Sequence, residues 1–579
     1  MSETRDLAEL AKRRGFFFPS NEAYGGTAGF YTYGPEGAAL KRNLEDVWRD
    51  LFVRALDNVE LEAPTIMPEA VFEASGHLDG FDDMIIECAE CGATHRADHL
   101  VEDAVADIED AEALGPERVG EFIAEHGIVC PACNAALADE PVEEFNLMFG
   151  TNIGPGSASR GYLRPETAQG IFVEFPRLKE YARNQLPFGV AQIGRAYRNE
   201  ISPRRALVRV REFTQAELEH FIDPERDEPP IGRVADVELP LYSATSQHDT
   251  DGTTETHTVR DALEEGIIDS DWVAYYLGCA IDFYERIGID MDRFRYRQHL
   301  PGERAHYAAD CWDAETELGG NWIEVTGFAY RSDYDLSNHG EYADESFTVF
   351  RQYDEPKTIE RAIVDPDMSY LGPEFGGDAA AVAEELDALA GRDRSAFEGE
   401  TVDVELDGDR YTIPVEKTGF AVEEQTEAGE HITPHVVEPS FGVDRLVYSV
   451  LIHVHETDTI DDEERSFLEL PAEMAPTTVA VVPLMAKDGL DDRARSIAEG
   501  LRTAGFEVAY DDTGNIGRRY RRQDEVGTPY CVTIDYETQE DGTVTIRERD
   551  STAQTRVDAD DLPAVIRRLV DGETLSDLS

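Results

Sequence analysis

Residues 195–211 read RAYRNEISPRRALVRVR and contain six arginines and a single acidic residue, Glu200. The whole chain carries 52 basic against 121 acidic residues, a formal net charge of −69. Guanidinium groups form paired hydrogen bonds with phosphate oxygens, and an aromatic ring such as that of Phe213 can stack on a base. Such a concentration of arginine in so acidic a chain therefore predicts a site for a nucleoside triphosphate.

The arginine-rich segment has the pattern of two strands joined by a turn. We expect strands at residues 190–200 and 207–213, and the Ser-Pro pair at 202–203 is typical of a turn. Arg198 and Glu200 would then share one face. A salt-bridged edge hairpin would show the same pattern. The chain has no GxxxxGK(S/T) motif, so a triphosphate would need another binding device. The return strand would carry on one face Arg209, Arg211 and Phe213.

Two further segments contain charged residues that suit a triphosphate. NWIEVTGFAYRSDYDL reads as a strand in which Glu324 faces away from its apolar neighbours. Opposite a triphosphate this carboxylate would bind Mg²⁺; otherwise it is a solvated strand residue. HVVEPSFGVDRLVYSVLIHV reads as a strand, a break from Pro439 to Gly442, and a helix with Arg445 in its first turn. A surface arginine is the alternative there. The helix would turn inward Val443, Leu446, Val447, Val450 and Leu451.

Four of the seven cysteines form two CxxC pairs, Cys88 with Cys91 and Cys130 with Cys133. This spacing is typical of a zinc ribbon, and the intervening residues can hold a helical insertion. A redox pair or incidental cysteines are the alternatives. The other cysteines, which we expect in the core, are Cys279, Cys311 and Cys531.

Composition limits the class of protein. A chain of 579 residues predicts three or more domains, and 41% hydrophobic residues suffice for packed cores. Acidic residues are spread along the chain, which favours adaptation to high salt over an ordinary acidic protein. No apolar signal core and no run of about 18 apolar residues is present, so we expect a cytoplasmic protein without a membrane span.

Periodicity predicts the elements around these motifs. Residues 40–56 should form a helix, and residues 222–260 and 375–400 look like insertions. An acidic linker is expected near 456–475, followed by an alternating α/β domain with an Arg-rich turn. The apolar face of the first helix would consist of Leu40, Leu44, Val47, Leu51 and Ala55.

The segments around Arg198, Glu324 and Arg445 resemble motifs 2 and 3 of the class II aminoacyl-tRNA synthetases and the strand preceding motif 3, and residues 40–56 resemble motif 1. The sequence of these segments most resembles that of glycyl-tRNA synthetases of the dimeric archaeal and eukaryotic type. The similar stretches are ASGHLDGFDD, RPETAQGIFVEF, YRNEISPR, VREFTQAELEHF, EPSFGVDR and GNIGRRYRRQDEVGTPYCVTID. They recur in order over almost the whole chain, which makes the resemblance specific.

The resemblance implies an α+β catalytic core of antiparallel sheet with flanking helices, an inserted zinc-ribbon-like unit and a C-terminal α/β anticodon-binding domain. The implied segments are core with motif 1 at 1–85, zinc-binding insertion at 86–135, core with motif 2 at 136–221, insertion and helical segment at 222–293, core strands at 294–350, insertion at 351–415, core with motif 3 at 416–472 and anticodon-binding domain at 473–579.

The resemblance also implies glycine–tRNA ligase activity and a set of site residues. Arg198, Glu200 and Arg445 would be catalytic, with Arg198 on the α-phosphate, Phe213 stacked on adenine and Glu324 lining the ATP and Mg²⁺ site. The implied ATP-binding residues are Arg198, Asn199, Glu200, Val208, Arg209, Val210, Arg211, Glu212, Phe213, Glu324, Val325, Gly442, Val443, Asp444 and Arg445. The implied glycine-binding residues are Arg96, Glu166, Phe213, Thr214, Gln215, Ala216, Glu217, Glu438, Pro439, Ser440, Phe441 and Gly442.

The partners implied are tRNA(Gly), glycine, ATP with Mg²⁺ and a second copy of the chain in a homodimer. Arg204 and Arg205 in the turn would face tRNA or solvent, and Arg195 would point to the opposite face of its strand. A non-catalytic synthetase-like subunit is the alternative, but such relatives typically lose the motif 2 and 3 arginines. The residues expected to meet tRNA in the anticodon domain are Arg518, Arg519, Arg521 and Arg522, for which a solvated helix face is the alternative.

Overall fold

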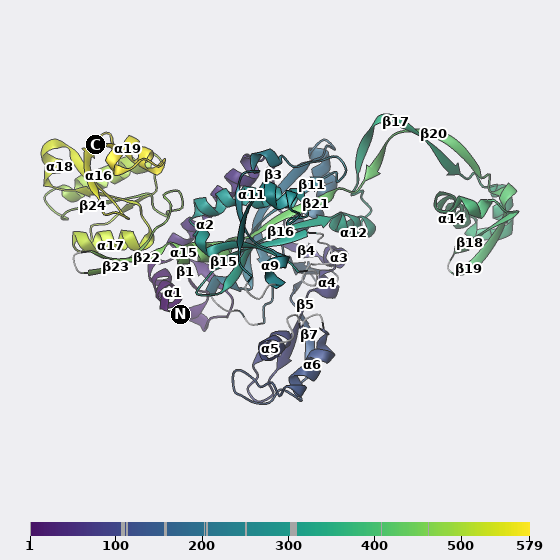
Figure 1. Ribbon diagram of the computed structural model, residues 1–579, viewed down its shortest axis with the longest axis horizontal. Helices are drawn as coiled ribbons and strands as arrows, with labels where there is room; N and C mark the ends of the chain where they lie inside the picture. Colours follow the sequence, from purple (N-terminus) through teal and green to yellow (C-terminus); the bar gives the residue numbers. More distant parts are fainter. Residues whose placement is uncertain are drawn as a thin grey trace. The chain divides into compact units, whose positions relative to one another are not determined.

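The computed structural model describes residues 2–105, 111, 114–155, 159–201, 203, 206–248, 252–300, 310–406, 408–460 and 463–578. The chain divides into two compact units, Met1–Phe347 with Pro434–Ser579, and Thr348–Thr433 (Figure 1). Ser202, Arg204 and Arg205 of the predicted turn lie outside the described residues.

A nine-stranded sheet forms the centre of the first unit, and most neighbouring strands in it are antiparallel, as predicted for the core. Parallel pairs occur where β12 meets β14 and where β10 meets β3. In spatial order the strands are β13 (Glu255–Thr258), β12 (Glu238–Tyr242), β14 (Phe294–Gln298), β15 (Asp310–Glu317), β16 (Trp322–Ser332), β21 (His435–Gly442), β11 (Glu212–Ile222), β10 (Phe188–Tyr197) and β3 (Val59–Glu60).

Residues 222–260, which looked like a surface insertion, supply two of these strands, β12 and β13, at one end of the sheet. Leu239 and Leu241 alternate with more exposed residues and are buried. Strand β12 is short, with only two buried residues, and its parallel partner β14 is distant in the sequence, so its local pattern gives little signal.

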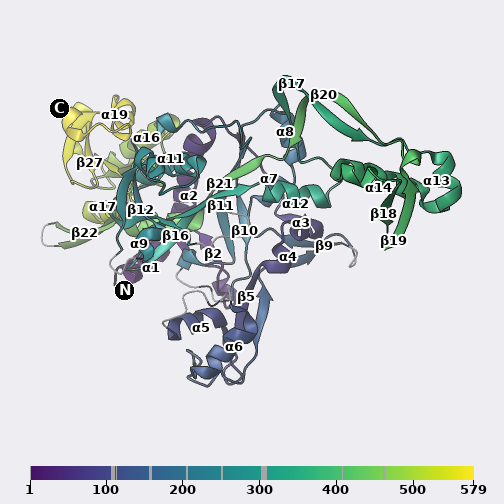
Figure 2. The ribbon, with the colours of Figure 1, turned by 45° about the vertical axis from the view of Figure 1, so that its right-hand side comes forward.

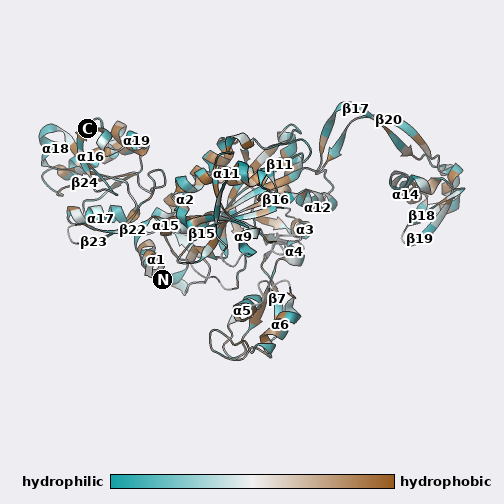
Figure 3. Ribbon diagram, in the orientation of Figure 1, coloured by the Kyte–Doolittle hydropathy of each residue, from teal (hydrophilic) through white to brown (hydrophobic). Residues whose placement is uncertain are grey.

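Helix α11 (Asp271–Ile287) packs against this sheet and carries hydrophobic residues along its length (Figure 3). Helix α2 (Pro35–Trp48) contacts it and continues as a π-helix over Arg49–Arg54. The wider turn of a π-helix shifts the inward face. Phe52 within the π-helix is fully buried, as is Trp48 before it, whereas Ala55, predicted to face inward, is exposed. The predicted face holds for Leu40, Leu44 and Val47.

The predicted strand over residues 207–213 is wrong for its first part. Strand β10 ends at Tyr197, a 3-10 turn spans Ala206–Val208, and β11 begins only at Glu212. The Arg211 carbonyl oxygen still accepts from the Arg198 amide at 3.0 Å, but the Arg211 amide donates to the distant Gly29 carbonyl oxygen at 2.8 Å. This long-range partner cannot be read from local alternation.

The predicted break from Pro439 to Gly442 is also wrong, because β21 runs through Pro439 to Gly442. Proline lacks the N–H that a central strand needs. The register with β11 accommodates this: Ser440 pairs with Glu217 and Val437 with His220, and no β11 residue pairs with Pro439, which pairs with Phe328 of β16 on its other side. Helix α15 (Val443–His453) follows, and its five predicted inward residues are all fully buried.

The cysteine-rich segment forms a small unit around a three-stranded sheet (Figure 2). Its core includes Ile86, Val101, Val119 and Ile123. Its elements are β5 (Asp82–Glu87), β6 (Thr94–Arg96), α5 (Ala97–Ala104), α6 (Pro116–Glu125) and β7 (Val142–Asn146).

The C-terminal part of the first unit is a five-stranded mixed sheet with helices, which agrees with the predicted α/β domain. A hairpin of β22 (His455–Ile460) and β23 (Glu463–Leu468) occupies the predicted linker, and the Arg-rich turn is largely helix α17 (Ile516–Val526). The sheet order is β25 (Val508–Tyr510), β24 (Val479–Pro483), β26 (Tyr530–Ile534), β27 (Thr543–Glu548) and β28 (Gln554–Asp558), with helices α16 (Leu490–Thr503), α18 (Tyr536–Asp541) and α19 (Leu562–Val570).

The second unit is wider than the predicted insertion at 351–415, because both strands of a long ribbon belong to it. None of the helices formed by described residues has the length and apolar character needed to cross a membrane. The unit contains β17 (Val349–Ile363), β20 (Ala421–Ile432), α13 (Met368–Phe375), α14 (Ala379–Arg392), β18 (Thr401–Leu406) and β19 (Asp409–Pro414).

Shorter elements complete the first unit. They are α1 (Ser2–Arg14), β1 (Phe17–Pro19), β2 (Tyr31–Tyr33), β4 (Ile66–Pro68), α3 (Glu69–Ala74), α4 (His77–Gly80), β8 (Phe149–Asn152), β9 (Arg160–Leu163), α7 (Gln169–Phe172), α8 (Phe175–Tyr181), α9 (Ala244–His248), α10 (Val259–Glu264) and α12 (Tyr334–Tyr342).

Candidate active site

Two cavities lie on the same face of the nine-stranded sheet. We call the first the arginine pocket; it is lined by Arg198, Glu200, Leu207, Val208, Arg209, Val210, Phe213, Thr214, Gln215, Glu324, Val325, Ser440, Gly442, Asp444 and Arg445. We call the second the carboxylate pocket; it is lined by Glu166, Arg198, Gln215, Glu217, His299, Cys311, Glu324, Gly327, Phe328, Ala329, Arg331, Glu438 and Ser440.

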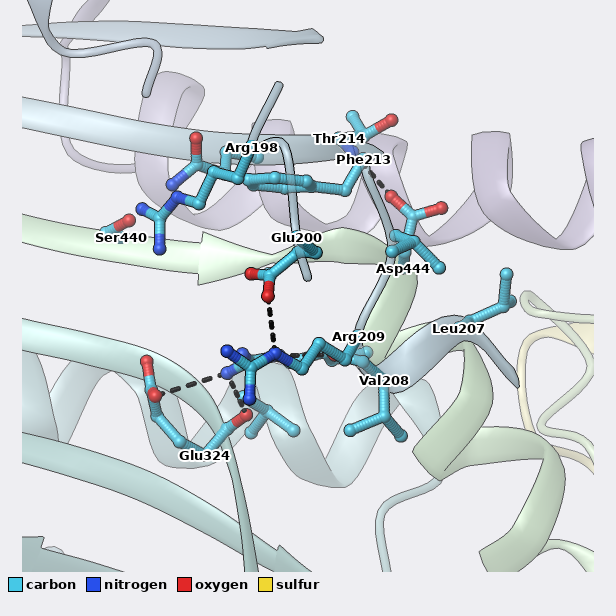
Figure 4. A pocket seen from close by; sticks show the side chains of 15 residues that line it. Arg198, Glu200, Leu207, Val208, Arg209, Phe213, Thr214, Glu324, Ser440 and Asp444 are labelled. Atoms are coloured by element: carbon cyan, nitrogen blue, oxygen red, sulfur yellow. Dashed lines mark hydrogen bonds and ion pairs between the residues drawn. The ribbon is translucent and has the colours of Figure 1, made fainter. Parts of the chain in front are cut away.

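Glu200 projects into the arginine pocket toward Arg209 (Figure 4). The Arg209 Nε donates to the Glu200 Oε2 at 2.5 Å. Arg198 lies over the ring of Phe213, with its guanidinium carbon 5.5 Å from the ring centroid. Two guanidinium groups, a carboxylate and an aromatic ring therefore meet in one cavity, as the sequence predicted.

Arg211, predicted to face the same cavity, is directed elsewhere. Its Nε donates to the Glu200 carbonyl oxygen at 2.9 Å and its Nη1 to the Ala28 carbonyl oxygen at 3.0 Å. The absence of a regular strand at residues 209–211 explains the difference, because side chains no longer alternate there.

Arg445 enters the arginine pocket from the first turn of α15. Its Nη1 lies 3.2 Å from the Glu324 Oε2 and donates to the Glu324 carbonyl oxygen at 2.8 Å. The charge of Arg445 lowers the pKa of Glu324, so this carboxylate is ionised at neutral pH. An anionic oxygen donor beside three arginines suits a metal–triphosphate complex.

Asp444 makes hydrogen bonds that stabilise the fold around the pocket. It accepts from the Tyr33 hydroxyl at 2.7 Å and from the backbone amide of Thr214 at 2.5 Å. Asp444 thus fixes the start of β11 beside the pocket, in addition to lining it.

The strand register builds the carboxylate pocket. Asp313 pairs with Gly327, Gly327 with Ser440, Ser440 with Glu217 and Glu217 with Gln192. Directly paired residues point to the same face of a sheet, so these four adjacent pairings form one row across five strands. Gly327 leaves space in the middle of this row, where an added Cβ would meet only the Asp313 Oδ1 at 3.8 Å.

Glu217 is fully buried and accepts several hydrogen bonds. Its donors are the Ala168 amide at 2.7 Å, the Ser440 hydroxyl at 2.6 Å, the Gln215 side chain at 2.8 Å and the Thr167 hydroxyl. Burial and the neighbouring charge of Glu166 nevertheless raise the pKa of Glu217.

Glu438 and Glu166 differ in protonation. Burial raises the pKa of Glu438 to about 8, against the opposing charge of Arg331, whose Nη1 donates to it at 2.6 Å. Burial also acts on Glu166, but the charges of His77 and Arg331 hold its pKa well below the usual range. The pocket therefore presents an ionised carboxylate and a carboxyl group that ionises near neutral pH.

Arg331 was not identified from the sequence. It is buried, bonds to both oxygens of Asp335 at 2.7 and 2.8 Å, and holds Glu438. The i,i+4 pair of Arg331 and Asp335 in AYRSDYDL was the available signal. Glu219, also missed, is fully buried near Glu438, and burial raises its pKa strongly.

Not all predicted residues line the two pockets. Arg96 is buried between Asp83 and Asp98 in the cysteine-rich unit. Ala216 and Phe441 belong to the core on the opposite face of the sheet. The other predicted residues that do not line either pocket are Asn199, Arg211, Glu212, Pro439 and Val443.

The four paired cysteines meet as predicted, with their sulfur atoms all within 4.8 Å of one another. Cys88 lies 3.6 Å from Cys133, and Cys91 lies 3.7 Å from Cys130. A tetrahedral zinc with sulfur ligands at about 2.3 Å requires sulfur–sulfur distances of about 3.8 Å. The donor set fits Zn²⁺. Of the remaining cysteines, Cys531 is buried and Cys311 lies in the wall of the carboxylate pocket.

The arginines of α17 are mostly bound within the protein. Arg519 is buried and donates to the Gly514 carbonyl oxygen at 2.8 Å, so it is not available to a phosphate. Arg521 pairs with Glu463 at 2.7 Å, and the Nε of Arg522 donates to Asp511 at 2.6 Å. Arg518 is exposed.

Comparisons with known proteins agree with this architecture. A family model described as tRNA synthetase class II core domain (G, H, P, S and T) matches residues 157–454, and one described as Anticodon binding domain matches residues 478–569. The fold and the matched core define a class II aminoacyl-tRNA synthetase.

Curated relatives narrow the class. A glycine–tRNA ligase from Methanothrix thermoacetophila is 48% identical over 99% of this chain and 98% of its own length. Those from Methanothermobacter thermautotrophicus and Archaeoglobus fulgidus are 45% and 46% identical over 97% and 98% of this chain and 98% and 97% of their own. The chain belongs to the glycine–tRNA ligase family. A solved prolyl-tRNA synthetase from Cryptosporidium parvum, complexed with L-proline and AMP, matches 98% of this chain and 77% of its own at a TM-score of 0.49 and 11% identity, too distant for any conclusion.

Proposed function

We propose that this chain activates glycine with ATP to glycyl-adenylate and pyrophosphate, and then transfers the glycyl group to the 3′ end of tRNA(Gly). The observation that carries this proposal is the continuity of the two pockets, which share Arg198, Gln215, Glu324 and Ser440. An amino acid in the carboxylate pocket would lie next to a triphosphate in the arginine pocket, which is the arrangement the first step requires.

In the arginine pocket, Arg198 binds the α-phosphate and Phe213 stacks on adenine. Arg445 covers the other face of the adenine and reaches the γ-phosphate, and Arg209 binds further phosphate oxygens. Glu324 would hold Mg²⁺, which supplies charge neutralisation of the phosphates when bound.

In the carboxylate pocket, Glu166, Glu217 and Glu438 bind the ammonium group of glycine. Arg331 holds Glu438 in place through its bond at 2.6 Å. Glycine offers no side chain, so recognition depends on its ammonium group and on excluding larger amino acids. One added methyl group gives about 1–3 kcal/mol of discrimination by lost fit.

Catalysis is positioning and electrostatic stabilisation. The glycine carboxylate attacks the α-phosphate in line and displaces pyrophosphate, while Arg198 and Arg445 neutralise the charge on the phosphates. No general base is required for this step, because the attacking carboxylate is already ionised.

We further infer that Cys88, Cys91, Cys130 and Cys133 hold a structural Zn²⁺ and that the chain forms a homodimer through the region of α2. The net charge of −69 supports the proposal that the protein works in a cytoplasm with a high salt concentration. Arg518, with Arg521 and Arg522 where tRNA displaces their acidic partners, is the proposed contact of the anticodon domain.

The proposal is tested by glycine-dependent ATP–pyrophosphate exchange in molar KCl. Arg198→Ala should abolish the exchange. Arg195→Ala, three residues earlier in the chain but paired with Glu212 at 3.7 Å outside both pockets, should retain it. Equal exchange by the two variants would contradict the assigned site.

A further inference from the structure

Asp83 lies at the second position of β5, the strand that begins the cysteine-rich unit, and its side chain is buried. Its Oδ1 accepts a hydrogen bond from the Arg96 Nη1. Its Oδ2 is buried without a hydrogen-bond partner among the described residues, and lies 3.8 Å from the Arg209 Nη2. One carboxylate thus joins an arginine of the cysteine-rich unit to an arginine of the arginine pocket.

Arg96, which is itself held by Asp98, restricts the orientation of the Asp83 side chain. The Nε of Arg96 donates to Asp98 at 2.9 and 3.1 Å, and Asp98 is only 1% exposed. Arg96 pairs with Ile85 of β5, two residues from Asp83. A buried arginine between two buried carboxylates has little freedom to rearrange, because each bond lost would leave a buried charge unpaired.

The side chain of Arg209, in contrast, is not held in place by regular secondary structure. It lies between the 3-10 turn at Ala206–Val208 and the start of β11 at Glu212, outside regular strand pairing. Its side chain is 31% exposed, and its charged partners are Glu200 and Asp83. Two carboxylates on one guanidinium restrict the rotamers that a long side chain otherwise samples.

We propose that Asp83 is a positioning residue that holds Arg209 in the geometry for binding a triphosphate, so that the cysteine-rich unit takes part in nucleotide binding. This inference rests on the proposed function of the arginine pocket. It also gives Arg96 a role, since Arg96 acts on the pocket through Asp83.

The test is equilibrium binding of ATP with Mg²⁺ by calorimetry, together with the KM values of the exchange reaction. Asp83→Asn should weaken ATP binding about five- to tenfold, as expected for loss of a largely buried ion pair. The KM for glycine should stay within about twofold, because the carboxylate pocket is untouched. Asp82→Asn is the matched control: it changes the neighbouring residue, which points to the other face of β5, and should bind ATP as the wild type does.

A double-mutant cycle separates positioning from general loss of structure. In an Arg209→Gln background, Asp83→Asn should cause no further loss of ATP binding, since the group it positions is gone. Additive losses, or an equal rise of both KM values, would overturn the inference. Asp83→Glu keeps the charge and should bind ATP more tightly than Asp83→Asn; equal binding by the two variants would also overturn it. Because ATP binding is measured without glycine, failure of glycine activation alone would count against the proposed function and not against Asp83.

Discussion

Glu438 shows how burial sets the chemistry of a single residue. It lies in a pocket with Glu166 and Glu217, and its pKa is raised to about 8 although Arg331 donates to it. With a pKa of about 8, the Glu438 carboxyl group is mostly protonated at neutral pH in the free protein. The ammonium group of glycine favours the carboxylate, so glycine binding should release this proton.

Glycine affinity should therefore rise with pH up to about 8, the pKa of Glu438 in the free protein, and level off above it. Below the folded pKa, binding must first remove the proton from Glu438; above it, the carboxylate is already formed. Calorimetry in buffers of different ionisation enthalpy measures both the affinity and the proton released. Glu438→Gln should weaken glycine binding and remove the pH dependence. A flat profile in the wild type would contradict the assignment.

At the scale of elements, the sequence pattern predicted those features that depend on residues close together in the chain. The helix of Arg445, the meeting of Arg198, Glu200 and Phe213, and the four cysteines were all predicted from spacing. The 3-10 turn before Glu212 was not, because the amide of Arg211 takes its hydrogen-bond partner from the distant loop at Gly29. The position of Arg331 in the pocket was not predicted for the same reason, because its partner Glu438 lies 107 residues away in sequence.

Removing metal should affect the cysteine-rich unit before the rest of the chain. Its core is small, and units of this size depend on cross-links or metals. Elemental analysis should find about one zinc per chain. A chelator, or Cys130→Ser, should release it and raise amide hydrogen exchange in β5, β6 and α5. Retention of zinc by Cys130→Ser, or unchanged exchange after zinc loss, would contradict the structural role. Cys279→Ser, outside the cluster, is the control.

At the scale of the whole molecule, charge is the dominant feature. A net charge of −69 creates self-repulsion that opposes folding and repels RNA. Salt screens it: the Debye length is about 10 Å at 0.1 M and about 3 Å at 1 M. Arg521 and Arg522 are paired with carboxylates, and the long-range field is set by the net charge, which already includes every arginine.

The melting temperature should therefore rise steadily as KCl increases from 0.1 to above 1 M. Differential scanning calorimetry measures it, and sodium sulfate at equal ionic strength separates screening from specific ion effects. If the melting temperature is the same at low and high KCl, the proposed adaptation to salt is wrong.

The central claim is that glycine in the carboxylate pocket reacts with ATP in the arginine pocket. The most direct measurement is amino-acid-dependent ATP–pyrophosphate exchange by the wild-type chain in molar KCl, with glycine, alanine, serine and proline compared. Exchange should depend on glycine, and alanine should be poorer by roughly 10- to 200-fold in kcat/KM because one added methyl group must be rejected. No exchange with glycine, or equal exchange with another amino acid, would contradict the account.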